Sequence, residues 1–237
     1  MYFVALATDY DGTLAEDGVV AEATLRALGL LKQSGRKLIL VSGRELPDLR
    51  RVFSRLDLFD LAVLENGALL VDPASGEETA LGDEPPAHFV EALQRRNVRP
   101  LSVGRSIVAT WEPNETIVLE TIWDLELELQ IVFNKGAVMV LPAGVNKASG
   151  LAAALSHLRL SPLNVVGIGD AENDHAFLRA CGCSVAVANA LPIVKADADI
   201  VTKAPRGAGV VETIERLLEN DLAEVARRGQ SSRDRPQ

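Results

Sequence analysis

Short apolar runs alternate along the chain with stretches of helical periodicity, and this alternation limits the fold more than any other feature. The runs have the length of β-strands, and turn residues separate them from the helical stretches. The strand candidates are Phe3 to Thr8, Lys37 to Val41, Leu61 to Leu64, Val165 to Ile168, Ser184 to Val187 and Asp199 to Val201. The helix candidates are 21–34, 45–56, 147–158, 172–181, 189–196 and 208–222. This order predicts βαβ units and an α/β fold with a Rossmann-like, mostly parallel sheet.

One long stretch, between about Gly82 and Gly144, interrupts the alternation. Its pattern is helix, hairpin, helix, hairpin, and the second hairpin turns at Lys135-Gly136. The helices are expected at 86–96 and 115–127, the first hairpin around Gly104-Arg105, and the second hairpin at 129–134 and 137–141. We interpret this αββαββ stretch as a small α+β domain inserted into the larger sheet domain.

The domain boundaries follow from this interpretation. Residues 1–81 and 145–222 form a discontinuous α/β core domain, and residues 82–144 form the inserted domain. Residues 223–237 lack apolar periodicity, so we predict a disordered tail or a linker.

The composition favours a globular protein that binds neither nucleic acid nor membrane. Of its 237 residues 48% are hydrophobic, which is ample for a core. The net charge of −9 opposes binding to nucleic acid, because phosphate neutralisation needs a basic face. The apolar runs are too short to span a bilayer, and the chain begins without a signal-peptide pattern. With Cys181 and Cys183 interpreted as reduced thiols, we expect a cytoplasmic protein.

Acidic residues follow two of the predicted strands. The first strand leads into Asp9-Tyr10-Asp11-Gly12-Thr13, and a later strand leads into Asp170-Ala171-Glu172-Asn173-Asp174. In open α/β sheets, ligands bind beyond the carboxyl ends of the strands. Neighbouring carboxylates raise each other's pKa unless a cation shares the site, and Mg²⁺ is the expected cation for oxygen ligands.

Two further motifs lie at predicted strand-to-helix junctions. A hydroxyl and backbone amides in Ser42-Gly43-Arg44 can bind a phosphate, although Ser-Gly is also a common turn. Asn146 is predicted to cap a helix that begins with Lys147. A lysine is unfavourable at the positive end of a helix dipole, so we expect a bound anion or a carboxylate beside it, unless it lies on the surface.

Together these motifs resemble those of the haloacid dehalogenase superfamily of phosphohydrolases. D-x-D-G-T, S-G-R, a lysine and G-D-x-x-N-D occur in that family's order, and the resemblance extends over residues 1–222. The insert lies between the serine and lysine motifs, as in the Cof-type, or IIB, branch with its C2-type cap. Asn66-Gly67-Ala68 before the insert is also similar to that branch. Within it, the chain is most similar to the small phosphoglycolate and sucrose-phosphate phosphatases.

The resemblance implies a Mg²⁺-dependent phosphomonoesterase that acts on a small-molecule phosphate ester, either a phosphosugar or a phospho-acid such as phosphoglycolate. Asp9 is the implied nucleophile that forms an aspartyl-phosphate, and Asp11 is the implied general acid and base. The implied metal ligands are Asp9, Asp11 through its backbone carbonyl, Asp170 and Asp174, the last through water or by anchoring the lysine. The implied phosphate- and substrate-binding residues are Gly12, Ser42, Gly43, Arg44, Lys147 and Asn173.

Two alternatives remain open at the level of sequence. One is a dedicated sucrose- or trehalose-phosphate-type phosphatase, and the other is a phosphatase-like binding or regulatory module of a larger protein. Substrate choice is expected to fall to the insert, where Trp111, Trp123 and Arg105 are candidates for contact with the leaving group or for ordinary packing and surface positions.

Overall fold

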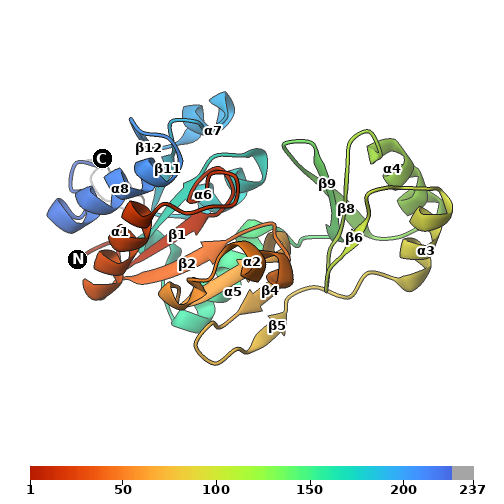
Figure 1. Cartoon of the computed structure of the whole chain (residues 1–237), viewed down its shortest axis with the longest axis horizontal. Helices are drawn as coiled ribbons and strands as arrows, with labels where there is room; N and C mark the ends of the chain where they lie inside the picture. Colours follow the sequence, from red (N-terminus) through yellow and green to blue (C-terminus); the bar gives the residue numbers. More distant parts are fainter. Residues whose placement is uncertain (226–237) are drawn as a thin grey trace, which may run out of the picture.

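The structure, a computed structural model, describes residues 1–225, and these residues contain a larger and a smaller β-sheet (Figure 1). The strands of the larger sheet are β1 (Ala5–Asp9), β2 (Lys37–Val41), β3 (Leu61–Leu64), β4 (Leu69–Val71), β5 (Glu78–Ala80), β10 (Val165–Gly169), β11 (Cys183–Ala186) and β12 (Ile200–Val201). Their spatial order is β12-β11-β10-β1-β2-β3-β4-β5. Neighbouring strands from β12 to β3 are parallel, whereas β4 and β5 add an antiparallel edge. The predicted α/β fold with a mostly parallel sheet is confirmed.

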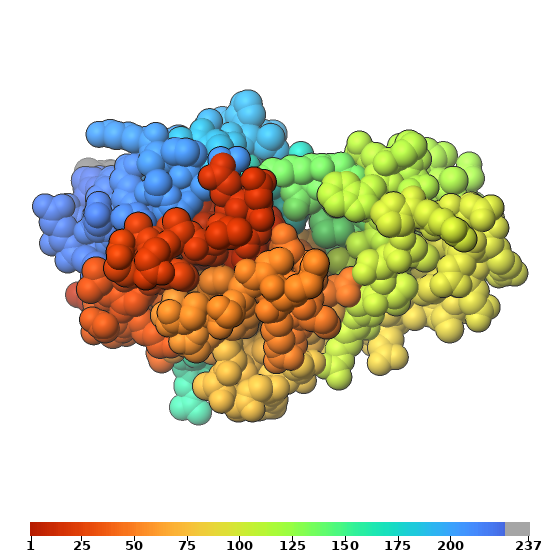
Figure 2. All heavy atoms as spheres, in the orientation of Figure 1, coloured from red at the N-terminus to blue at the C-terminus, as the bar shows by residue number. Residues whose placement is uncertain are grey.

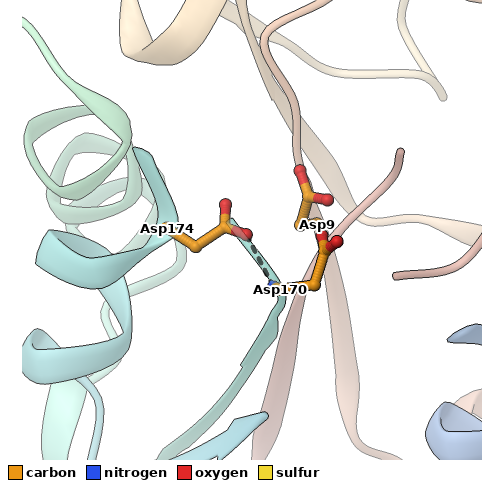
Figure 3. A group of neighbouring side chains, drawn as sticks. All are labelled: Asp9, Asp170 and Asp174. Atoms are coloured by element: carbon orange, nitrogen blue, oxygen red, sulfur yellow. Dashed lines mark hydrogen bonds between the residues drawn. The ribbon is translucent and has the colours of Figure 1, made fainter. Parts of the chain in front are cut away.

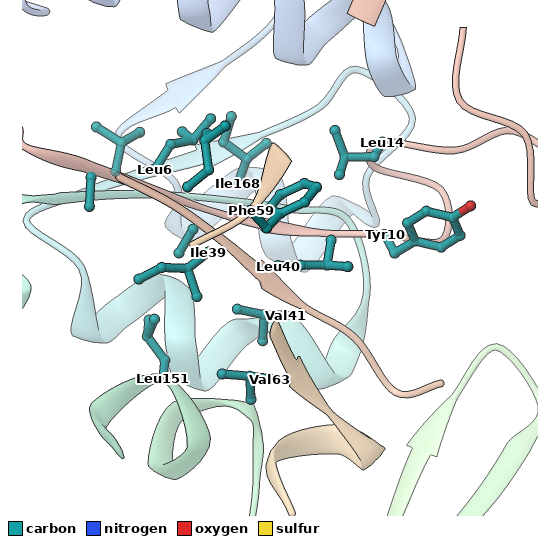
Figure 4. Packing of buried hydrophobic residues seen from close by; sticks show 14 of the residues in the cluster. Leu6, Tyr10, Leu14, Ile39, Leu40, Val41, Phe59, Val63, Leu151 and Ile168 are labelled. Atoms are coloured by element: carbon teal, nitrogen blue, oxygen red, sulfur yellow. The ribbon is translucent and has the colours of Figure 1, made fainter. Parts of the chain in front are cut away.

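Helices cover this sheet in two packed groups. They are α1 (Glu22–Gln33), α2 (Leu46–Val52), α5 (Lys147–Leu158), α6 (His175–Ala180), α7 (Pro192–Asp197) and α8 (Arg206–Asn220). Helix α1 packs against α8, while α5 packs against α6 and against strand β3. Because helices cover the parallel strands, side chains on both faces of these strands are buried. Among them are Leu6, Ile39, Leu40, Val63 and Ile168, with Leu151 of α5 packed nearby (Figure 4).

The smaller sheet belongs to the predicted insert. Its strands are β6 (Ser102–Val103), β7 (Val108–Trp111), β8 (Leu129–Asn134) and β9 (Ala137–Pro142), in the order β6-β7-β9-β8. Helices α3 (Ala87–Arg95) and α4 (Glu115–Asp124) pack on one face of this sheet, over a core that includes Val138 and Val140. Since strand residues alternate between faces, Ala137 and Met139 lie on the other face. The αββαββ order is confirmed, and we call α3 to β9 the insert; the exact domain boundaries stay a prediction.

The sequence did not reveal every element. The hairpin of β4 and β5 was not predicted, because each strand has three residues and all of β5 is exposed. Cys181 and Cys183 are both buried. Most of the predicted tail, residues 226–237, lies outside the described part of the chain. Among the described residues, no helix has the length and apolar character needed to cross a membrane.

A close contact between two glycine-bearing segments sets the position of helix α5. Gly67 lies in the turn after β3 with φ +110°, and a Cβ there would lie 2.0 Å from the Asn146 carbonyl oxygen. The same Cβ would lie 3.0 Å from the amide nitrogen of Lys147. Only glycine therefore allows the start of α5 to lie against this turn.

We predict that Gly67→Ala lowers the free energy of unfolding by about 2–4 kcal/mol, because it combines unfavourable φ with a backbone clash. The matched control is Gly76→Ala, where φ is +75° but nothing lies within 4 Å of the added Cβ. That control is expected to lose about 1 kcal/mol. Urea unfolding measures both, and equal losses would contradict the proposed role of the contact.

Candidate active site

Three aspartates meet where two adjacent strands of the larger sheet end. Asp9 is the last residue of β1, Asp170 directly follows β10, and Asp174 lies in the short 3₁₀ turn Glu172–Asp174. Strands β1 and β10 pair in parallel, with Thr8 opposite Ile168, so their carboxyl ends lie side by side. One carboxylate oxygen from each aspartate lies within 4.8 Å of the other two (Figure 3). We call these three buried residues the carboxylate cluster.

Lys147 enters the cluster from the first turn of α5. Its Nζ lies 2.5 Å from Asp9 Oδ1 and 2.6 Å from Asp174 Oδ1, and the residue is 1% exposed. Asn146 caps the helix as predicted, since its side chain accepts hydrogen bonds from the amides of Ala148 and Ser149. The carboxylates compensate for a lysine at the positive end of the helix dipole, which was one of the two expected solutions.

Asp174 holds the lysine and the loop after β10 together. Its Oδ2 accepts hydrogen bonds from the backbone amides of Asp170 and Ala171 at 2.8 and 2.9 Å. Its Oδ1 accepts from Lys147. With both oxygens used by the protein, Asp174 is suited to anchoring.

The electrostatics of the cluster follow from its burial. Burial raises the pKa of Asp9 well above its usual value, and the charge of Asp174 raises it further, although Lys147 opposes this. Burial likewise raises the pKa of Asp170, against the opposing hydrogen bond from Lys135. Burial alone lowers the pKa of Lys147, but the charges of Asp174 and Asp9 outweigh it, so this pKa is raised.

The donor set of the cluster fits a divalent cation. All three side chains offer hard oxygen ligands, and their mutual repulsion raises the cost of keeping each of them ionised. A cation between them removes that cost. The cluster is therefore a candidate metal site.

Asp11 lies apart from the cluster and pairs with Arg44. The arginine holds both carboxylate oxygens, with Nε 2.7 Å from Oδ2 and Nη2 2.7 Å from Oδ1. Arg44 also pairs with Asp48 and lies over the ring of Tyr10, 5.5 Å from its centroid. Arg44, predicted to bind substrate, thus orients the side chain of Asp11 in this structure.

An open pocket of about 530 Å³ lies between the strand ends and the insert. Asp9, Asp11 and Arg44 line it from the core, and Trp111, Lys135 and Met139 line it from the insert. Figure 2 shows the insert, in yellow and green, lying against the red and orange amino-terminal part of the core. The pocket has the volume of a small-molecule site.

The remaining residues that were predicted to bind phosphate or substrate make different contacts. The Gly12 amide donates to the Ala15 carbonyl at 3.1 Å, and Ser42 Oγ accepts from the Arg44 amide at 3.2 Å. Gly43 lines the pocket. Asn173 donates from Nδ2 to Asn66 Oδ1 at 2.9 Å, and a Cβ on Gly43 would lie 4.0 Å from each of these two atoms.

Of the three residues of the insert that were candidates for contact with the leaving group, one lies at the pocket. Trp111 lines the pocket. Trp123 is 81% exposed on α4 and Arg105 pairs with Glu78, and neither lines the pocket.

Two residues of the site were not predicted. Lys135, in the turn between β8 and β9, places its Nζ 2.5 Å from Asp170 Oδ2. Asn66, fully buried beside Asn173, has an Nδ2 without a partner among the described residues. The sequence predicted a turn at both positions. The one available sign of a functional role was Lys135 itself, because a hairpin turn of this kind favours Asn or Gly at that position.

The comparisons with known proteins agree with this geometry. The chain matches the family described as haloacid dehalogenase-like hydrolase over residues 6–103 and 118–214. Phosphoglycolate phosphatase 2 of Saccharolobus solfataricus is 30% identical over 92% of this chain and 94% of its own length. A phosphoglycolate phosphatase of Methanothermobacter thermautotrophicus is 30% identical over 90% of this chain and 98% of its own.

Solved structures share the fold. A sugar phosphatase of HAD subclass IIB has a TM-score of 0.75 at 21% identity, and the match covers 90% of this chain and 98% of that chain. This likeness supports the arrangement of a mostly parallel sheet with a separate small antiparallel sheet.

We predict that Lys147→Met destabilises the fold by about 3–5 kcal/mol near neutral pH, because it leaves buried carboxylates without their partner. A carboxyl group whose pKa is raised by folding stabilises the folded state at low pH, and this contribution is lost as the pH rises through the folded pKa. Asp9 is such a group, so the loss in the variant is expected to shrink at roughly pH 5.

Urea unfolding in EDTA at both pH values measures this effect. Lys203→Met, at an exposed position, serves as the control and is expected to change stability by less than about 0.5 kcal/mol. A Lys147→Met loss that is the same at both pH values would contradict the assignment.

Proposed function

This chain belongs to the haloacid dehalogenase-like hydrolase family, and from that membership and the site we propose that it is a Mg²⁺-dependent phosphomonoesterase for small organic phosphates. The observation that carries the proposal is the buried ion pair of Asp9 with Lys147 at the end of β1, in which Asp9 also lines the pocket. An ionised carboxylate at such a position is a nucleophile aimed at a bound ligand.

Asp9 is the proposed nucleophile. Lys147 holds its Oδ1 and, by its positive charge, favours the ionised carboxylate against the effect of burial. Attack of an Asp9 oxygen on phosphorus forms the aspartyl-phosphate and breaks the bond to the ester oxygen.

Asp11 is the proposed general acid and base. Its half-exposed side chain lines the same pocket, two residues beyond the nucleophile, and Arg44 orients it. Once it is protonated and released from Arg44, Asp11 gives its proton to the leaving ester oxygen. It then takes a proton from the water that attacks the aspartyl-phosphate. The second step releases phosphate and restores the carboxylate of Asp9.

Mg²⁺ is proposed as the cation of the carboxylate cluster. Asp9 and Asp170 would hold it, with the Asp11 backbone carbonyl as a further ligand, and the hydrogen bonds of Asp174 favour its role in anchoring Lys147. When bound, the ion neutralises the charge of the phosphoryl oxygens, which otherwise repels an anionic nucleophile.

A short phospho-acid such as phosphoglycolate is the first candidate substrate. The name of the two relatives at 30% identity supports it, whereas the sugar phosphatase shares 21% identity and supports the fold. The alternative of a binding or regulatory module is weaker, because a module that only binds has no need of Asp9, Asp11, Lys147 and Asp170 together. We also propose a cytoplasmic location, on the interpretation of Cys181 and Cys183 as reduced thiols.

The proposed function predicts phosphate release from a panel of p-nitrophenyl phosphate, phosphoglycolate and sugar phosphates. Release is expected with Mg²⁺ and not with EDTA. Asp9→Asn is expected to lower turnover by about 10⁴-fold or more, because it removes the nucleophile.

Asp57→Asn is the matched control, since this aspartate pairs with Arg55 at the surface, away from the pocket. Its turnover is expected to equal that of the wild type. Undiminished, metal-independent turnover in Asp9→Asn would rule out the proposed mechanism.

A further inference from the structure

The hairpin turn between β8 and β9 places the ammonium group of Lys135, a residue of the insert, against the core domain. Lys135 and Gly136 both have positive φ, 48° and 86°, the pattern of a type I′ turn. The turn directs the lysine toward the strand ends, where its Nζ lies 2.5 Å from Asp170 Oδ2. A Cβ on Gly12 would lie 2.7 Å from this Nζ, so the ammonium group lies directly over the loop that follows Asp9.

The remaining surface that the insert gives to the pocket is uncharged. Its apolar members include Ile107, Ala109, Trp111 and Met139. Thr110, one of its few hydroxyl groups, already donates to the Pro100 carbonyl at 2.6 Å. Asn134 adds one amide, whose Oδ1 has no partner among the described residues. A sugar leaving group with several hydroxyls would still leave most of them unpaired against this surface, and unpaired polar groups are costly to bury.

The two cationic side chains that the core places at the site, Arg44 and Lys147, already have carboxylate partners. Arg44 holds Asp11 and Asp48, and Lys147 holds Asp9 and Asp174. The partner of Lys135 is Asp170, which the proposed function assigns to the metal ion. The Lys135 side chain is also 47% exposed, so packing does not confine it to one position. Lys135 is thus the cation that the insert can offer to a ligand.

We propose that Lys135 determines the substrate specificity of this site. Its ammonium group recognises a carboxylate on the leaving group. The inference rests on the proposed function and narrows its substrates to short phosphorylated hydroxy acids. In phosphoglycolate, one ester oxygen and one methylene carbon separate phosphorus from the carboxylate carbon. This second negative charge needs a counter-charge close to the phosphoryl site, and Lys135 supplies it from the opposite wall of the pocket.

The test compares 2-phosphoglycolate with 2-hydroxyethyl phosphate, in which a neutral hydroxymethyl group replaces the carboxylate. Lys135→Met is expected to lower kcat/KM for phosphoglycolate by about 10- to 100-fold, mainly through KM, because a charge-assisted contact is lost. Its effect on the neutral ester is expected to stay within about threefold. Lys135→Arg is expected to recover most of the phosphoglycolate activity, and Lys203→Met, at an exposed position, is the control.

Calorimetry in the Asp9→Asn background separates this inference from the proposed function. Adding Lys135→Met to that background is expected to weaken binding of phosphoglycolate and to leave binding of the neutral ester unchanged. If the wild type hydrolyses neither ester and this difference in binding persists, the proposed function fails and the inference stands. Equal losses for both esters, or no loss for phosphoglycolate, would overturn the inference while leaving the phosphatase activity in place.

Discussion

The ion pairs of Lys147 with Asp9 and Asp174 are the interaction on which the rest of the site depends. A fully buried lysine between two buried carboxylates persists only when each charge has a partner, because an unpaired buried charge is very costly. The pairing fixes Asp9 Oδ1, and through Asp174 it also fixes the loop that carries Asp170. The resulting excess of carboxylates over ammonium groups favours a metal ion beside Asp9 and Asp170, and the same charges activate the nucleophile that we propose.

The fold brings these charges together through two features of its backbone. Parallel pairing places the carboxyl ends of β1 and β10 side by side, which brings Asp9 and Asp170 to one edge of the sheet. The contact between Gly67 and the Asn146 carbonyl lets the start of α5 lie against the turn after β3, so Lys147 reaches that edge from a fixed position. The insert then lies over the edge and adds Lys135, and we propose that the core carries the chemistry while the insert selects the substrate.

The sequence predicted the elements and residues that local patterns encode. Strands β2 and β3 and helix α5 have the predicted bounds, because turn residues or a cap delimit each of them. The predicted acidic strand ends do meet in one cluster. The sequence did not predict which distant side chains come into contact. Arg44 pairs with Asp11, 33 positions away in the sequence, and Lys135 reaches Asp170 from a separate hairpin. Hydrophobic periodicity along the sequence does not predict which strand end a distant turn will contact.

In the mechanism that we propose, Asp9 becomes covalently phosphorylated. The most direct test mixes the Asp11→Asn variant with p-nitrophenyl phosphate and Mg²⁺ and analyses the quenched protein by peptide mass spectrometry. Because p-nitrophenolate leaves without a general acid, the first step is expected to proceed, while loss of the base slows hydrolysis of the intermediate. A phosphoryl group is therefore expected to accumulate on Asp9. A variant that turns over with no phosphoryl group on Asp9, or with one on another residue, would contradict this mechanism.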